Sequence, residues 1–207
     1  MGWLFEARRR YGFCLLNYVA TSNHVHLLVL DRGESRTISR SMQLIAGRTA
    51  REFNQRKKRK GAFWEDRYHA TPVQTDHHLF RCMAYMDLNM VRAGVVDHPG
   101  EWEFGGYAEV MTDRERCRIT DFDSLVEFSG AESPETMLRL RGQWVEDALA
   151  RGVQARQGKW TESVAVGGET FVENVKAKLG LRARGRRISG AGNNFTLRET
   201  QEDFGDG

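Results

Sequence analysis

The residues best suited to chemistry are His24 and His26, which flank Val25 in a segment rich in strand-forming residues. Side chains two residues apart in a strand point to the same face, about 6.6 to 7 Å from each other. Two imidazoles so placed can converge on one divalent ion, while Val25, Leu27 and Val29 point the other way, into a core. Such a pair alone is more often two histidines on a half-solvated strand face, so a metal site needs a third ligand and a reacting group.

A helix predicted from His77 to Arg92 supplies both of these. Tyr85 and Asn89 are four residues apart and therefore lie on one helical face, one turn from each other. Arg81 and Arg92 continue that stripe. An amide oxygen suits Mg²⁺ or Mn²⁺ beside two imidazoles, and a tyrosine hydroxyl one turn away can attack a phosphorus atom held by that ion. A tyrosine that only packs its ring is the alternative for Tyr85 considered alone.

Three motifs in the same order resemble those of the REP-associated tyrosine transposases, which are HUH single-tyrosine transposases. Residues 22–28, SNHVHLL, resemble the HUH motif, which usually reads PNHVHLL. Residues 85–94, YMDLNMVRAG, resemble the tyrosine helix, commonly YIxLNPVRAG, and residues 63–68, FWEDRY, resemble the aromatic linker before it. The order, spacing and local pattern agree from about residue 3 to about residue 110.

This resemblance implies a transposase that cleaves and rejoins single-stranded or hairpin DNA through a 5′-phosphotyrosine intermediate. It implies His24 and His26 as ligands of a divalent ion, Mg²⁺ or Mn²⁺, with Asn89 as the third ligand. Tyr85 is implied as the nucleophile. Met90 departs from the family, because relatives usually have proline there. Relatives also carry a further strand before the point where this chain begins.

A basic stretch between residues 32 and 67 is the candidate for DNA contact. It holds eleven basic and four acidic residues, an excess of seven positive charges, which suits salt-dependent phosphate contacts. A solvated helix end is the alternative. Trp64, Tyr68 and Tyr107 are candidates for stacking on unpaired bases. The residues predicted to contact DNA are Arg48, Arg51, Arg56, Lys57, Lys58, Arg59, Lys60, Trp64, Arg67 and Arg81.

The elements that must position these residues predict an α+β fold. Residues 3–11 have a helical pattern ended by Gly12, residues 13–20 and 24–30 form a predicted hairpin, and residues 35–60 form a predicted helix. The resemblance implies a ferredoxin-like antiparallel sheet with helices on one face, its first strand missing. We therefore expect an N-terminally incomplete catalytic domain over residues 1–111.

Residues 112–207 are expected to form a mainly helical C-terminal extension with a basic, polar tail. Ser133 and Pro134 are typical of a helix start, residues 170–179 form another predicted helix, and the chain from Ser189 is expected to fray.

The remaining composition favours a reduced, non-membrane location. Cys14, Cys82 and Cys117 share no CxxC spacing, which argues against a disulfide framework or a zinc ribbon. No apolar run reaches the roughly 18 residues of a membrane span, and no signal peptide is visible, so the prediction is cytoplasmic.

Two other functions stay open. One is a non-catalytic DNA-hairpin-binding protein descended from a transposase, which would have no need of the tyrosine or the histidine pair. The other is a zinc hydrolase, which lacks the third histidine or carboxylate that such sites favour.

Overall fold

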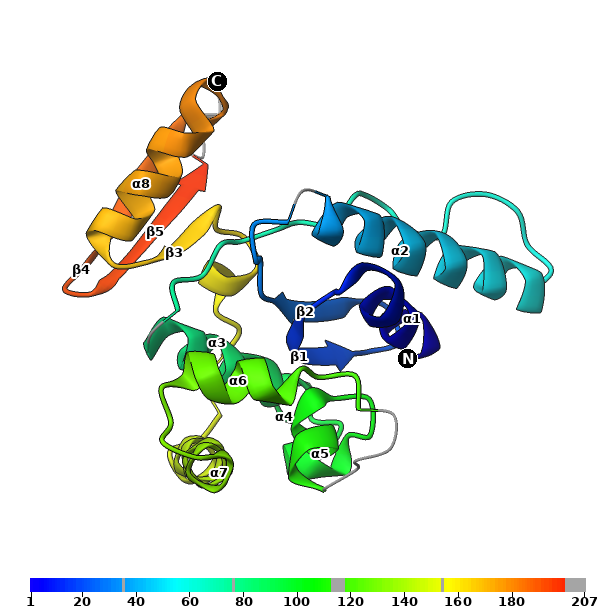
Figure 1. Ribbon diagram of the computed structural model, residues 1–207, viewed down its shortest axis with the longest axis horizontal. Coiled ribbons are helices and arrows are strands. Elements are labelled where there is room, and N and C mark those ends of the chain that lie inside the picture. The colour runs from blue at the N-terminus through cyan, green and yellow to red at the C-terminus, as the bar shows by residue number, and fades with distance from the viewer. Residues whose placement is uncertain (35, 76, 113–117, 154, 200–207) are drawn as a thin grey trace, which may run out of the picture. The chain divides into compact units, whose positions relative to one another are not determined.

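The computed structural model describes residues 1–199 except residues 35, 76, 113–117 and 154. These residues form two compact units, and the helices and strands of both confirm the α+β class (Figure 1). The first unit comprises Met1–Tyr68 and Met83–Val153, and the second comprises His69–Cys82 and Gln154–Gly207. The units therefore cut across the predicted division at residue 111, because residues 112–153 lie in the first unit and residues 69–82 in the second.

The first unit contains a two-stranded antiparallel sheet of β1 (Leu15–Ala20) and β2 (Val25–Val29), which confirms the predicted hairpin. On the opposite edge of β1, the N–H of Ala20 donates to the carbonyl of Phe104 at 2.9 Å. The helices of the unit are α1 (Gly2–Tyr11), α2 (Thr37–Arg56), α4 (Asn89–Arg92), α5 (Gly106–Met111), α6 (Phe122–Ser129) and α7 (Pro134–Ala150), with the 3-10 turn η1 (Pro99–Glu101). Helix α3 (His77–Asp87) begins in the second unit and ends in the first.

Helices α1 and α2 cover one face of this sheet (Figure 1). Helix α1 ends as predicted at Gly12, whose φ of 67° is the left-handed conformation that closes a helix readily with glycine. Their shared core contains Leu4 of α1, Tyr18 of β1, Leu27 of β2 and Met42 of α2. The hairpin is therefore fixed on one face and leaves its other face for different contacts.

The second unit is a three-stranded antiparallel sheet with one helix packed on it. The strand order is β3-β5-β4. Its elements are η2 (Gly158–Trp160), β3 (Ala165–Gly167), α8 (Glu169–Leu179), η3 (Gly180–Ala183), β4 (Arg186–Ala191) and β5 (Asn194–Glu199). The expectation that the chain frays from Ser189 is wrong for residues 189–199, because Ile188 and Leu197 pair across β4 and β5 and join the core under α8.

Two helix predictions in the C-terminal part are confirmed. Helix α7 starts at Pro134, and the Ser133 hydroxyl caps it by accepting from the N–H of Thr136 at 3.2 Å. Helix α8 covers the predicted residues 170–179. Cys14 and Cys82 are buried and form no disulfide with a described residue, whereas Cys117 lies outside the described residues. None of the helices in the described ranges has the length and apolar character to cross a bilayer.

Candidate active site

The hairpin register decides which way the histidines point. His26 lies opposite Val19, and the next pair along the hairpin is Tyr18 with Leu27. Because Tyr18 and Leu27 face the core with α1 and α2, His26 faces the opposite side of the sheet. The predicted inward position is confirmed for Leu27 but wrong for Val25. Val25 pairs with Ala20 next to the turn and is 39% exposed.

The two imidazoles are close and partly oriented by the turn. Their ring centroids are 4.9 Å apart with the rings at 74° to each other. His24 Nδ1 lies 2.8 Å from Asn23 Oδ1, and its backbone N–H donates to Thr21 Oγ1 at 3.1 Å. With the Nδ1 proton donated to Asn23, the lone pair of His24 is on Nε2, the arrangement that metal-binding histidines adopt.

In the part of the chain that the structure describes, no three histidine, cysteine or acidic side chains are grouped as the ligands of one metal ion would be. An amide oxygen, such as that of the predicted ligand Asn89, is compatible with this. Asn89 is half-buried and is the first residue of α4. Its approach to the two imidazoles stays a prediction.

The tyrosine helix is not continuous, contrary to the prediction for residues 77–92. Helix α3 ends at Asp87 and α4 begins at Asn89, and Leu88 between them has φ −80° and ψ 8°. Leu88 is buried in a cluster with Tyr107 and Val145, so tertiary packing coincides with the break. Tyr85 and Asn89 therefore lie on two consecutive helices, with Leu88 between them.

Arg92 holds Tyr85 across this break. Its guanidinium Nη2 donates to the backbone carbonyl of Tyr85 at 2.7 Å, and its Cζ lies 3.9 Å from the centroid of the tyrosine ring. Burial lowers the pKa of Arg92, while the contact with Tyr85 opposes that shift. One cation thus contacts both the backbone and the ring of the predicted nucleophile.

The end of α3 is anchored to the hairpin by a buried ion pair that the sequence did not reveal. Asp87 accepts from Arg141 Nε at 2.9 Å and from Arg141 Nη2 at 2.8 Å. Asn17 of β1 donates to Asp87 at 2.8 Å and accepts from Arg141 at 2.9 Å. Asn17 and Val19 point to the same face of β1, and Val19 is paired with His26. The tyrosine-bearing helix therefore ends on the sheet face that carries His26.

Comparison with known protein families tests the resemblance of this chain to the tyrosine transposases. Residues 3–88 match the model of the IS200-like transposases. This segment of the chain is therefore similar to that family. No curated protein and no solved structure matches the chain. The family match confirms the resemblance to tyrosine transposases. It includes His24, His26 and Tyr85 and ends one residue before Asn89.

The basic segment of the transposase domain folds back on the last turns of α2. Asn54 donates to the carbonyl of Gly61 at 2.9 Å, and Phe63 contacts Phe53 with ring centroids 4.6 Å apart. The Trp64 indole N–H donates to the carbonyl of Ala46 at 3.0 Å, so its edge is engaged while the residue is half-buried. The cations predicted to contact DNA in this unit are exposed: Arg48, Arg51, Arg56, Lys57, Lys58, Arg59, Lys60 and Arg67.

The three remaining predicted DNA contacts, Tyr107, Tyr68 and Arg81, have different surroundings. Tyr107, expected to be accessible for base stacking, is only 5% exposed. The Cζ atom of Arg141 lies over its ring, 5.4 Å from the ring centroid. The prediction that it stacks on unpaired bases is therefore wrong, and burial raises the pKa of its hydroxyl. Tyr68 is 50% exposed. Arg81 belongs to the second unit, where it donates to Asn194 Oδ1.

Proposed function

We propose that the transposase domain cleaves and rejoins single-stranded, hairpin-containing DNA, with Tyr85 as the nucleophile. The supporting observation is the sheet face shared by His26 and the end of the Tyr85-bearing helix, which the Asn17–Asp87 hydrogen bond fixes. The match of residues 3–88 to the IS200-like transposases supports a role in transposition generally. The chemistry below goes further and rests on the proposed roles of these residues.

His24, His26 and Asn89 are the proposed ligands of Mg²⁺ or Mn²⁺. The paired imidazoles fit this role, because they are adjacent and His24 has its Nδ1 engaged by Asn23. When bound, the ion supplies positive charge that stabilises the phosphoryl group and orients the strand. The hairpin supplies rigidity, since its other face is packed against α1 and α2.

Tyr85 carries out the covalent step. Its hydroxyl oxygen forms a bond to phosphorus and loses its proton, while the bond from phosphorus to the 3′ oxygen breaks and that oxygen takes up a proton. The DNA is then held as a 5′-phosphotyrosine. Attack by a 3′-hydroxyl reverses the step and needs no external energy. Arg92 serves to position the tyrosine, because it contacts both the ring and the carbonyl of this residue.

The exposed cations at the end of α2 are the proposed contacts for the DNA backbone. Because the segment after α2 is tied back by Asn54 and Trp64, its cations are held near one another. Their affinity for DNA falls as salt rises, since binding releases counterions.

Incubation with single-stranded hairpin DNA and Mg²⁺ or Mn²⁺ tests the proposal. A covalent protein–DNA adduct is expected, which a chelator abolishes and for which duplex DNA is a poor substrate. Tyr85→Phe deletes only the attacking hydroxyl and should remove the adduct, whereas Tyr68→Phe, at an exposed tyrosine, should retain it. Hairpin binding without an adduct under any metal condition would favour the non-catalytic DNA-binding function. A phosphotyrosyl peptide containing Tyr68 would overturn the assignment to Tyr85.

A further inference from the structure

The sheet of the second unit has one face covered by α8 and one face rich in polar and basic side chains. Phe195 and Leu197 of β5 belong to the core with α8. Side chains alternate along a strand, so Thr196 and Arg198 point to the opposite face. Their partners on β4 are Ser189 and Arg187, both exposed.

Two arginines lie directly across from each other on this face. Arg187 pairs with Arg198 in the β4–β5 register. Like charges in directly opposed positions destabilise an antiparallel pair. Arg198 Nε donates to the Ser163 hydroxyl at 3.1 Å, which orients its guanidinium without neutralising it. The repulsion between Arg187 and Arg198 therefore destabilises the folded state, and an anionic ligand bound there would offset this repulsion.

Two further cations lie near this pair within the second unit. Arg81 donates to Asn194 Oδ1 on β5. The pKa of Lys159 is lowered, first by burial and then by repulsion from Arg81 and Arg198, so these three cations are neighbours. None of the four cations pairs with a carboxylate among the residues that the structure describes. The cluster thus combines concentrated positive charge with neighbouring hydroxyl and amide groups.

We propose that this sheet face, formed by Arg81, Lys159, Arg187 and Arg198 with Ser189 and Thr196, binds the backbone of duplex DNA. Arginine, lysine, serine and threonine are the side chains that contact DNA phosphates, and paired strands fit the major groove. Binding of unpaired bases uses aromatic stacking. The strands of this sheet contain one aromatic residue, Phe195, and it belongs to the core under α8. The site needs neither Tyr85 nor a metal, so it goes beyond the proposed cleavage reaction.

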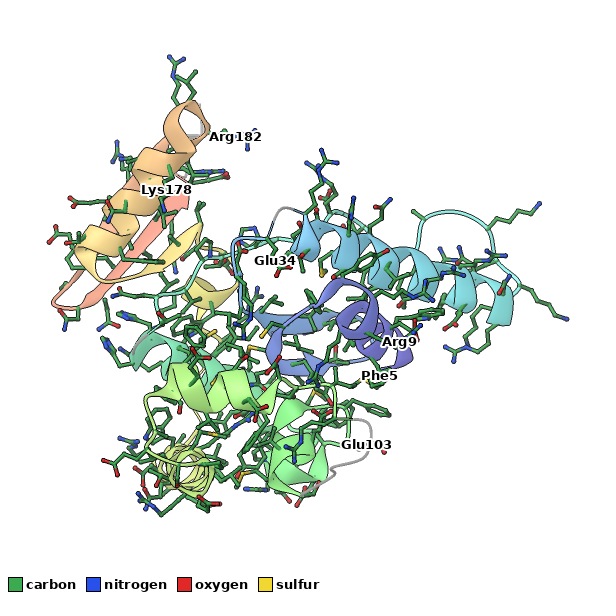
Figure 2. The ribbon with its side chains drawn as sticks, in the orientation of Figure 1. Phe5, Arg9, Glu34, Glu103, Lys178 and Arg182 are labelled. Atoms are coloured by element: carbon green, nitrogen blue, oxygen red, sulfur yellow. The ribbon has the colours of Figure 1, made fainter. Side chains whose placement is uncertain are left out.

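The same unit provides a control with equal charge. Lys178 on α8 and Arg182 just after it are exposed and project from the end of α8 (Figure 2). Because α8 packs against the other side of the sheet, removing these two cations lowers the net charge equally but leaves the proposed face intact.

Fluorescence anisotropy with a labelled duplex of random sequence, and with a single strand of equal length, tests the proposal. The full chain carries Tyr85→Phe, and a chelator is present, so that failure of the cleavage proposal cannot affect the result. Combining Arg187→Ala with Arg198→Ala should weaken duplex binding about tenfold and reduce the slope of log affinity against log salt by about two. Combining Lys178→Ala with Arg182→Ala should change the duplex affinity by less than about twofold and leave the slope of log affinity against log salt nearly unchanged.

Arg187→Glu alone provides a check on folding, because this exposed side chain makes no buried contact that its loss would break. It should weaken duplex binding while leaving the circular dichroism spectrum unchanged, and the unfolding midpoint should not fall, because a glutamate opposite Arg198 replaces a like-charge pair. Equal losses from the sheet-face and α8 pairs would overturn the proposal, because binding would then follow net charge alone. An unchanged duplex affinity in Arg187→Glu would also overturn it. A loss confined to the single strand would overturn the assignment to duplex DNA.

Discussion

The buried pair of Asp87 and Arg141 is expected to dominate the stability of the first unit. The side chains of Arg141 and Asp87 are only 3% and 1% exposed, and their closest contact is 2.8 Å. Arg141→Leu removes the two hydrogen bonds that Arg141 donates to Asp87 and the one that it donates to Asn17. It leaves a carboxylate buried with the Asn17 amide as its remaining hydrogen-bond donor in this group.

The expected loss is about 3 to 5 kcal/mol, the usual result of removing one partner of a buried ion pair. With a urea dependence of about 2 kcal/mol per molar, the unfolding midpoint should fall by about 2 M. Replacing both partners, Asp87→Leu with Arg141→Leu, removes the orphaned charge and leaves Asn17 as the main unsatisfied group. The double variant should therefore lose only about 1 to 3 kcal/mol.

Urea unfolding followed by tryptophan fluorescence measures this directly, because Trp3, Trp64, Trp102 and Trp144 lie in the first unit. Arg151→Ala is the control: its 3.9 Å pair with Asp147 is exposed and should contribute less than about 1 kcal/mol. If the losses of the two single Leu variants simply add in the double variant, the residues are not coupled and the reasoning fails.

Three further predictions concern the candidate site and the core. His24→Ala or His26→Ala should abolish adduct formation while leaving hairpin binding largely intact, measured by gel shift; loss of both would show that the pair is needed to organise the DNA site. Asn89→Ala should raise the metal concentration needed for half-maximal cleavage without abolishing it, and an unchanged metal titration would exclude Asn89 as a ligand. Burial raises the pKa of the Cys14 thiol, so the folded state holds that proton more tightly than the unfolded state. This contribution to the free energy of unfolding is fully present below the pKa of the unfolded thiol, about 8.5. It is lost as the pH rises from that value through the higher pKa of the folded state. The urea midpoint of the native protein should fall more steeply than that of Cys14→Ala at alkaline pH, and parallel curves would contradict this.

Local sequence patterns determined much of the fold and the choice of the candidate site residues. The helix that ends at Gly12, the hairpin carrying His24 and His26, and the start of α7 at Ser133 all depend on neighbours a few residues away. Alternation, helical spacing and capping are visible at that range. The motifs around Tyr85 likewise indicated the transposase family, which the match over residues 3–88 confirms.

Only the tertiary structure decided which groups became buried and which elements were interrupted. Tyr107 had the aromatic character of a surface binder, yet it packs with Leu88 and Val145. Leu88 interrupts a pattern that is locally helical, and strands β4 and β5 form in a stretch rich in glycine and asparagine. Each outcome depends on pairing or packing that local propensity does not encode.

The anchor of the tyrosine helix shows the physical reason most clearly. Arg141 is 54 residues from Asp87 and 124 residues from Asn17. Nothing in the sequence around Asp87 marks its partner, because any arginine would satisfy the carboxylate chemically. The choice of Arg141 depends on where α7 packs, and that is fixed by the burial of residues such as Met137 and Val145 on the same helix. The sequence by itself therefore determined which residues carry the proposed chemistry, whereas the tertiary structure determined what holds them in place.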